Sequence, residues 1–462
     1  MRFSAIPLFD FAGDCIECLL IHKIKKRTLF FNQYQNYFLV LNRKIAPPIT
    51  TINRLDLPQH QKIMLSNNLP LYVLNMGTQE VVKLQIIFES GRPYEKKRLA
   101  AKTTCSQLKE GTYNHSSKAI AEKIDYYGAT LSTPSNLDYS SIILYCLTKH
   151  LESLIPLLTD IIVNPIFPQE ELDAYLENSK RRLQIDLTKN DVVAYRKITE
   201  FIFGSNHPYG YNSVNADFEK LSRNDLVQHF QQNYTTGNCH IFISGKINDA
   251  TIKLLKTNLE QIPIGSKAIL PNFELTKEPP QKRHIDIPNS VQTAIRIGMR
   301  SIGRNHPDFA GFSILSTILG GYFGSRLMTN IREDKGYTYN IYVTQDTMLY
   351  DNCFYVSTEV GNEFVVPTIK EIHKEFDRLQ QDFVSDAELQ MVRNYMLGNM
   401  LNMVDGPFHS MEVIRTLMMY KLPLDSFSQL IYTINQITPE QLRMLAQKYL
   451  NASEMWEVTA GS

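Results

Sequence analysis

The chain has 462 residues, of which 43% are apolar and 21% charged, and its 48 basic residues nearly balance its 47 acidic ones. At about 100–200 residues per domain, this length predicts two to four domains with a sizeable core. The even charge argues against a nucleic-acid-binding protein, and no apolar run is long enough to span a membrane, so we expect a soluble cytoplasmic protein with neither partner.

Residues 1–55 are predicted to be an N-terminal extension and linker. The apolar stretch Phe3–Ile21 is interrupted by three acidic residues, which argues against a secretory signal. We expect residues 1–43 to be dispensable for folding. Cys15 and Cys18 form a C-x-x-C pair without a second Cys or His pair nearby, so we expect no zinc site there, although a metal or redox role remains the alternative.

Between residues 56 and 263, strand-like and helix-like patterns alternate. The β-rich runs Leu71–Leu74 and Val81–Phe88 flank Gly77 and predict a β-hairpin. Two further strands are expected at Ser140–Leu147 and His240–Ser244. Helical patterns occupy the ranges Arg98–Leu108, Ser117–Tyr127, Leu151–Val163, Pro168–Asp186 and Arg223–Tyr234.

Residues 264–288 are rich in Pro and charge, which predicts a linker before a second domain at 289–462. Three pairs of segments then echo each other at an offset of about 215 residues, too long for a solenoid repeat. The echoes join 90–92 with 301–304, 166–172 with 382–389, and 221–234 with 437–450. We interpret them as a duplicated domain; generic amphipathic similarity is the alternative.

Several motifs resemble the insulinase/pitrilysin family of zinc peptidases, which includes the mitochondrial processing peptidases. The most specific segment is ILGGYFGSRLMTNIREDKGYTYNIYV at 318–343. The first domain is matched by FESGRPYE at 88–95, GATLSTPSNLDYSSI at 128–142 and HPYG at 207–210. The resemblance covers roughly residues 55–455. It implies an α+β fold of two tandem processing-peptidase-like domains, each a mostly antiparallel sheet packed with helices, together forming a half-clamshell.

The family carries zinc on an inverted His-x-x-Glu-His motif, with a third ligand from a later helix. Aligning on Gly111 and Thr112 places the five motif positions at Lys102-Thr103-Thr104-Cys105-Ser106. Both His are therefore replaced, and the third ligand falls at Arg181, or at Arg182 after a one-residue slip. Zinc needs about three protein ligands, and the cationic side chains of Lys102 and Arg181 would repel it. We therefore expect no metal in this chain.

Cys105 stands where the family has its general base. It is either a substitute nucleophile, activated by Lys102 one helical turn away, or a buried cysteine in a degenerate site. We favour the second interpretation, because the sequence shows no base that would orient the thiol.

In the second domain, Arg332 and Tyr339 stand at the spacing of the family's Arg/Tyr pair. The resemblance implies that they hold the substrate carbonyl and stabilise its developing charge. The structural alternative is that Arg332 pairs with Glu333 or Asp334 while Tyr339 packs in a strand.

The glycine-rich run before this pair aligns with a substrate-handling loop of the non-catalytic processing-peptidase subunit, but it is shorter. It is therefore either a substrate-binding segment or only a tight helix–strand connection. Its residues are Gly320, Gly321, Tyr322, Phe323 and Gly324.

The zinc-ligand positions of the first domain are replaced, whereas the Arg/Tyr pair of the second domain is present. Together these features predict the non-catalytic, substrate-binding subunit of a heterodimeric zinc endopeptidase, and we expect this chain to be inactive alone. The expected partners are a zinc-bearing paralogous subunit and peptides. Two alternatives remain open: a structural or interaction subunit without a peptidase role, and an enzyme active alone through a non-standard site.

Overall fold

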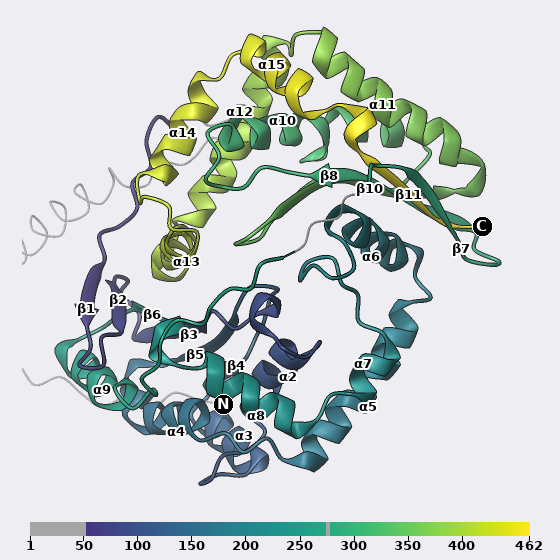
Figure 1. Cartoon of the computed structure of the whole chain (residues 1–462). Coiled ribbons are helices and arrows are strands. Elements are labelled where there is room, and N and C mark those ends of the chain that lie inside the picture. The colour runs from purple at the N-terminus through teal and green to yellow at the C-terminus, as the bar shows by residue number, and fades with distance from the viewer. Residues whose placement is uncertain (1–51, 274–277) are drawn as a thin grey trace, which may run out of the picture. The chain divides into compact units, whose positions relative to one another are not determined.

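Two β-sheets, each covered by helices, organise the computed structural model, which describes residues 52–273 and 278–462 (Figure 1). Each sheet contains one parallel strand pair, and its other strand pairs are antiparallel. The α+β fold expected from the sequence is confirmed.

The first sheet has the strand order β1-β2-β6-β3-β5-β4. Its central strand β3 reads VVKLQIIF and is buried along nearly its whole length, because side chains pack against both faces of the sheet. The strands are β1 (Gln61–Met64), β2 (Pro70–Asn75), β3 (Val81–Phe88), β4 (Thr130–Ser132), β5 (Ser140–Leu147) and β6 (Cys239–Gly245).

The predicted hairpin between β2 and β3 is wrong. Gly77 does adopt the left-handed conformation of a turn residue, with φ of 97°. However, β6 lies between the two strands, parallel to β2 and antiparallel to β3. The local signal identified both strands and the turn, whereas the pairing depends on a strand more than 150 residues further along the chain.

The five helices predicted in the first half agree with the structure to within a few residues, whereas α6, α7 and α9 were not predicted. Ser222 caps α8, accepting a hydrogen bond from the Asp225 amide while the Asp225 carboxylate accepts from the Ser222 amide. The helices are α2 (Ala100–Gln107), α3 (Ser117–Tyr126), α4 (Leu151–Val163), α5 (Gln169–Asp186), α6 (Asn190–Phe203), α7 (Asn215–Glu219), α8 (Arg223–Asn233) and α9 (Asp249–Leu259).

The second sheet repeats the topology of the first. Its order β7-β11-β8-β10-β9 matches β2-β6-β3-β5-β4 strand for strand, and β7 runs parallel to β11 as β2 does to β6. Identical pairing in two sheets supports duplication over generic similarity. The strands are β7 (Lys282–Asp286), β8 (Gln292–Arg300), β9 (Ile341–Thr347), β10 (Asn352–Gly361) and β11 (Trp456–Gly461).

The helices of the second half carry the same repeat. α12 and α5 both have 18 residues, and α15 and α8 both have 11. The cap of α15, Thr438 with Gln441, repeats the capping box of α8. The helices are α10 (Phe309–Gly320), the π-helix η4 (Met328–Asp334), α11 (Val365–Gln381), α12 (Asp386–Met403), α13 (Gly406–Met419), α14 (Ser426–Gln436) and α15 (Pro439–Tyr449).

Two segments assigned to linkers contain ordered structure. The predicted linker 264–288 includes β7, which reads KRHID and is mostly exposed, so it lacks the alternating apolar pattern that predicts a strand. The predicted extension ends too late, because Ile52 and Leu55 pack against the core of the second half and the Ser428 hydroxyl donates to the Leu55 carbonyl. The expectations for residues 1–43, Cys15 and Cys18 lie outside the described residues.

The two halves contact each other through α6, through α13 and through the β9–β10 turn. Ile198 and Ile202 of α6 pack against Trp456 and Val458 of β11. At the turn, the Tyr350 hydroxyl lies 2.6 Å from the Tyr94 hydroxyl of the first half. Helix α6, absent from the predicted elements, thus joins the first half to the second sheet.

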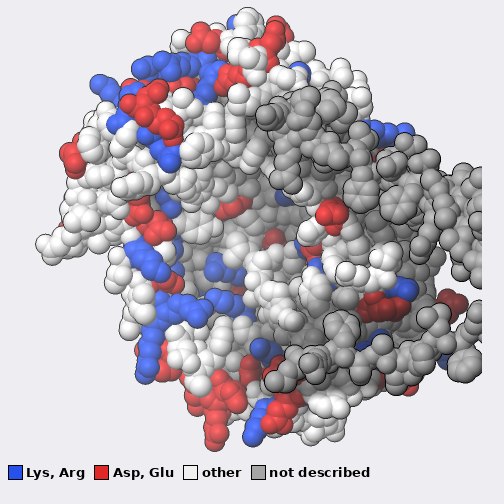
Figure 2. Space-filling view, turned by 180° about the vertical axis from the view of Figure 1, so that it is seen from behind, with Lys and Arg blue, Asp and Glu red and all other residues white. Residues whose placement is uncertain are grey.

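Acidic and basic side chains intermingle over the face shown in Figure 2 and do not gather into one large patch of a single sign. None of the helices in the ranges 52–273 and 278–462 combines the length and apolar content that a membrane crossing requires.

Candidate functional site

The first-half motifs converge around Gly91. Its amide donates to the Asp138 carbonyl at 3.0 Å, and a Cβ at this position would lie 2.3 Å from the Leu137 carbonyl oxygen. Only glycine permits this approach. Arg92 then donates to the carbonyls of Pro208 and Tyr211 at 3.2 and 3.0 Å, so the segments at 88–95, 128–142 and 207–210 meet at one place.

The degenerate zinc motif lies on α2. Lys102 is exposed, and the Ser106 hydroxyl donates to the Lys102 carbonyl at 3.0 Å and lies 3.3 Å from the Tyr175 hydroxyl of α5. The structure therefore places α5 beside the position of the second motif His. Sequence reasoning missed Tyr175, which lies about two helical turns before the position aligned with the third ligand.

Arg181 does not reach α2. Its side chain is 69% exposed, and its Nε pairs with the Glu177 carboxylate one turn earlier on α5, at 3.1 Å. Arg182 is exposed too. Within the described part of the chain, no three His, Cys, Asp or Glu side chains lie together in a group able to hold a metal ion.

Cys105 lies on the buried face of α2 and is fully buried. Its thiol donates to the carbonyls of Thr133 and Pro134, at 3.4 and 3.6 Å. Burial raises the pKa of the Cys105 thiol to about 11, because the thiolate would lose its hydration. A protonated thiol without access to solvent is a poor nucleophile, so the environment matches a buried cysteine in a degenerate site.

Arg332 and Tyr339 are joined directly. Arg332 lies in the π-helix η4, a type of helix that is often found at functional sites, and its Nε donates to the Tyr339 carbonyl at 3.0 Å. Arg332 also pairs with Glu333, as the structural alternative expected. Tyr339 does not pack in a strand: its side chain is 90% exposed, just before β9. The pair thus has a fixed backbone and a free phenol.

The glycine-rich run lies against the same pair. The Phe323 ring, 65% exposed, contacts the Arg332 guanidinium, whose carbon is 4.5 Å from the ring centroid. Gly320 ends α10 so close to β9 that a Cβ would lie 2.6 Å from a methyl group of Val343. The run is therefore a tight helix–strand connection that also presents an aromatic ring to Arg332.

Tyr322 and Gly321 are held by α12. The Tyr322 and Tyr395 rings lie 5.2 Å apart, and the Tyr395 hydroxyl donates to the Gly321 carbonyl at 3.4 Å. The Tyr322 hydroxyl contacts the Met391 sulfur at 3.6 Å. Gly324 borders the adjoining 560 Å³ cavity together with Tyr322.

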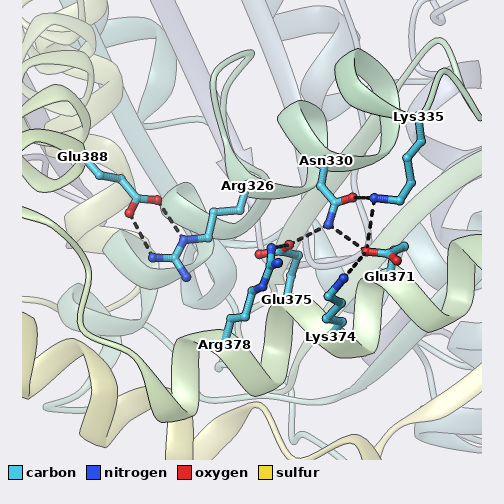
Figure 3. Close-up of polar contacts among 8 residues, drawn as sticks. All are labelled: Arg326, Asn330, Lys335, Glu371, Lys374, Glu375, Arg378 and Glu388. Carbon is cyan, nitrogen blue, oxygen red and sulfur yellow. Dashed lines mark hydrogen bonds and ion pairs between the residues drawn. The ribbon is translucent and has the colours of Figure 1, made fainter.

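A network of charged side chains holds η4 on both sides of Arg332 (Figure 3). Two residues before Arg332, the buried Asn330 donates to Glu371 and Glu375 of α11, at 3.0 and 2.6 Å. Three residues after it, Lys335 pairs with Glu371 at 3.4 Å. At the start of the helix, Arg326 makes two hydrogen bonds with Glu388 of α12, both 2.9 Å.

The charged groups of this network are stabilised by hydrogen bonds and ion pairs within the network itself. Although burial opposes ionisation, hydrogen bonds from Asn330 and Lys335 lower the pKa of Glu371. Similarly, the Glu388 carboxylate raises the pKa of Arg326 against the effect of burial. The charges therefore lock η4 onto α11 and α12.

The structure groups the second-half site residues and separates them from the first-half positions. Among the hydrogen bonds and ion pairs of the described ranges, none joins α2 to Arg332, Tyr339 or the glycine-rich run. The second-half group offers a guanidinium and a phenol as hydrogen-bond donors, which suits a polarised carbonyl oxygen.

Comparison with known proteins gives a family likeness. Residues 220–396 match the model described as the peptidase M16 inactive domain. The chain is 22% identical over 297 residues to a Bacillus subtilis protein named uncharacterized zinc protease YmxG, covering 63% of this chain and 71% of that protein. It is 23% identical over 306 residues to a Helicobacter pylori protein named non-peptidase homolog YmxG, covering 65% and 69%.

A solved structure has the same fold. The peptidase M16 inactive domain from Pseudomonas fluorescens superimposes with a TM-score of 0.79 at 22% identity, covering 87% of this chain and 98% of that one. The motifs, the fold and these likenesses together confirm the resemblance to the insulinase, or M16, family of zinc peptidases, and the family's inactive domain is the part matched at residues 220–396.

Proposed function

We propose that this chain is the non-catalytic, substrate-binding subunit of a heterodimeric zinc endopeptidase. Its partner is a paralogous subunit that carries the zinc, and its substrates are peptides. Arg332 and Tyr339 act on the scissile carbonyl at the partner's site. The partner's zinc would supply Lewis-acid activation there.

The observation that carries the proposal is the arrangement of Arg332 and Tyr339. The Tyr339 backbone is held by Arg332, yet its phenol is 90% exposed. Phe323 lies over the guanidinium, and the Figure 3 network holds the helix that carries Arg332. Donors that are already positioned stabilise developing negative charge without reorganising, which is why such groups account for much of acyl-transfer catalysis.

The first half supports a role without its own metal. The positions of the family's ligands hold Lys102, Ser106 and Arg181, and the position of its general base holds the buried Cys105. A cation and a hydroxyl on α2 are poor substitutes for imidazole ligands. The Helicobacter pylori relative is itself named a non-peptidase homolog.

The two alternatives differ in what they require. A purely structural subunit needs no exposed Tyr339 beside Arg332, so substitutions there would leave its assembly unaffected. An enzyme active alone through Cys105 needs an accessible thiolate, and the burial and raised pKa of Cys105 oppose that.

The test mixes this chain with a paralogue from the same genome that retains His-x-x-Glu-His, and follows cleavage of an internally quenched peptide. We expect no cleavage by this chain alone and cleavage by the mixture. Arg332→Ala with Tyr339→Phe is expected to lower kcat about a hundredfold or more, because each removes a donor to the carbonyl oxygen.

The matched control is Arg283→Ala with Tyr432→Phe, an exposed arginine and an exposed tyrosine elsewhere in the second half. It is expected to retain full activity. Full activity in the Arg332/Tyr339 variant would refute the assigned role, and cleavage by the isolated chain would refute the division of labour.

A further inference from the structure

One cavity bordered by described residues lies away from Arg332 and Tyr339. It has a volume of about 850 Å³ and opens between α13, α14, the end of α12 and the segment leading into α10. This size is typical of ligand sites. Its apolar lining includes Met400, Val413, Leu417, Leu422, Phe427 and Leu430.

Two exposed cations border this apolar surface. Arg304 lies over the rings of Phe309 and Tyr420, at 5.6 and 5.1 Å, and its Nε donates to the Thr347 hydroxyl. Lys421 follows the end of α13 in the left-handed conformation, with φ of 54°. Among the residues that the structure describes, no carboxylate forms an ion pair with either of them.

The carboxylate on the cavity lining does not neutralise them. Glu412 pairs with the buried Lys83 of the first half and with Arg415, 2.7 Å away on its own helix. Asp308, just before α10, pairs with Lys448 at 2.7 Å. The groove thus combines an apolar floor with a positive rim.

We propose that this groove binds an acidic amphipathic helix, whose apolar face covers Leu417, Leu422 and Leu430 and whose carboxylates pair with Arg304 and Lys421. Its long walls are α13 from His409 to Leu417 and α14 from Ser426 to Thr433. The α14 stretch of eight residues extends about 12 Å, so the groove accepts about two turns. A helix laid into an apolar groove is a recurrent mode of peptide recognition.

The charges at the rim of the groove favour an acidic occupant. A carboxylate near Arg304 or Lys421 would form an ion pair with it, whereas an ammonium group would be repelled by both cations. The site shares no residue with the Arg332 group, so it holds whether or not the chain serves a peptidase.

The test measures fluorescence anisotropy of a labelled 14-residue peptide with leucines on one helical face and glutamates on the other, titrated with the full chain. We expect binding by the wild-type chain. Arg304→Glu with Lys421→Glu is expected to weaken binding at least about tenfold, since two attractive pairs become repulsive. Lys421→Glu alone, at an exposed position, should weaken it measurably without disturbing the Arg304 ring contacts.

The matched control is Lys220→Glu with Lys256→Glu, two exposed residues of the first half, the first directly after α7 and the second on α9. It changes the net charge of the chain by the same amount and should leave the affinity unchanged. Two control peptides replace the glutamates with lysines or the leucines with serines, and both should bind at least tenfold more weakly. No binding of the acidic peptide, equal binding by the folded Arg304/Lys421 and Lys421 variants, or equal binding of the lysine peptide would overturn the proposal.

Discussion

Cys105 shows how one side chain's surroundings decide its chemistry. The residue stands where the family has a general base, and Lys102 is one turn away on α2. Those facts allow a reactive thiol. The carbonyls of Thr133 and Pro134 and the enclosing core instead hold it protonated, with burial raising its pKa to about 11.

Cys105→Ser tests this directly. We expect the mixed enzyme to keep its activity within about twofold, because a thiol that is protonated at pH 7 to 8 has no catalytic part. The stability cost should resemble that of Cys239→Ser, another fully buried thiol in the first half, and be about 1 kcal/mol in urea unfolding. Loss of activity in a folded Cys105→Ser variant, with Cys239→Ser still active, would instead support Cys105 as a nucleophile.

At the scale of single elements, η4 is attached to α11 and α12 by the residues around Arg332 and not by Arg332 itself. Glu375, 2% exposed, accepts from Asn330 and Arg378. A buried carboxylate is stable only while such donors remain. The packing of η4 therefore depends on Asn330.

Asn330→Ala is expected to lower the free energy of unfolding by about 1–3 kcal/mol, because Glu375 loses a donor while remaining buried. The measurement is urea unfolding. Lys374→Ala is the control: this half-exposed side chain contacts Glu371 at 3.5 Å, and its loss should change stability by less than about 0.5 kcal/mol. Equal effects of the two substitutions would show that the network does not stabilise η4.

At the scale of the whole described unit, two copies of one sheet topology are joined by contacts that neither copy holds alone. The Asp138 carboxylate of the first half accepts hydrogen bonds from the Tyr209 hydroxyl and from the Leu349 amide of the β9–β10 turn. Burial outweighs these bonds and raises the pKa of Asp138 to about 6. The joint between the halves therefore contains a titrating acid.

The contribution of Asp138 to stability should consequently rise as the pH falls from 8 to 5. The folded pKa of Asp138 exceeds the unfolded value of about 3.9, so the folded state binds more protons in this window. Between pH 8 and pH 5 this contribution grows by about 1.4 kcal/mol, because the window reaches about one unit below the folded pKa and each unit corresponds to about 1.4 kcal/mol. Burial lowers the pKa of His229 to about 4, which works against this rise in both the wild type and the variant. Thermal unfolding from pH 5 to 8 should therefore show a smaller gain toward acid pH in Asp138→Asn than in the wild type. An unchanged pH profile in Asp138→Asn would exclude Asp138 as its source.

Two other acids set the limits of that experiment. Burial also raises the pKa of Glu95 to about 6, so part of the rise should persist in Asp138→Asn. Glu89 acts oppositely: despite burial, hydrogen bonds from His240 and Lys267 lower its pKa to about 2. Its stabilisation is present above pH 4.5 and lost below, which is why the comparison stops at pH 5.

Sequence alone determined the elements and their repetition. Helices such as Leu151–Val163 and strands such as Ser140–Leu147 lie where they were predicted, because caps, breakers and periodicity act over short windows. The echoes at one offset anticipated the duplicated topology. The resemblance carried by its motifs predicts roles for Arg332, Tyr339 and the altered zinc-ligand positions, and these stay predictions.

Only the tertiary structure decided how those elements meet. It placed β6 between β2 and β3, brought Phe323 onto Arg332 and set Tyr175 beside Ser106. Sheet order and side-chain environment arise from burial and pairing between segments far apart in the chain, which no local window contains. The sequence thus identified which groups are available, and packing decided which are buried, which are paired and which, like Tyr339, remain free to act.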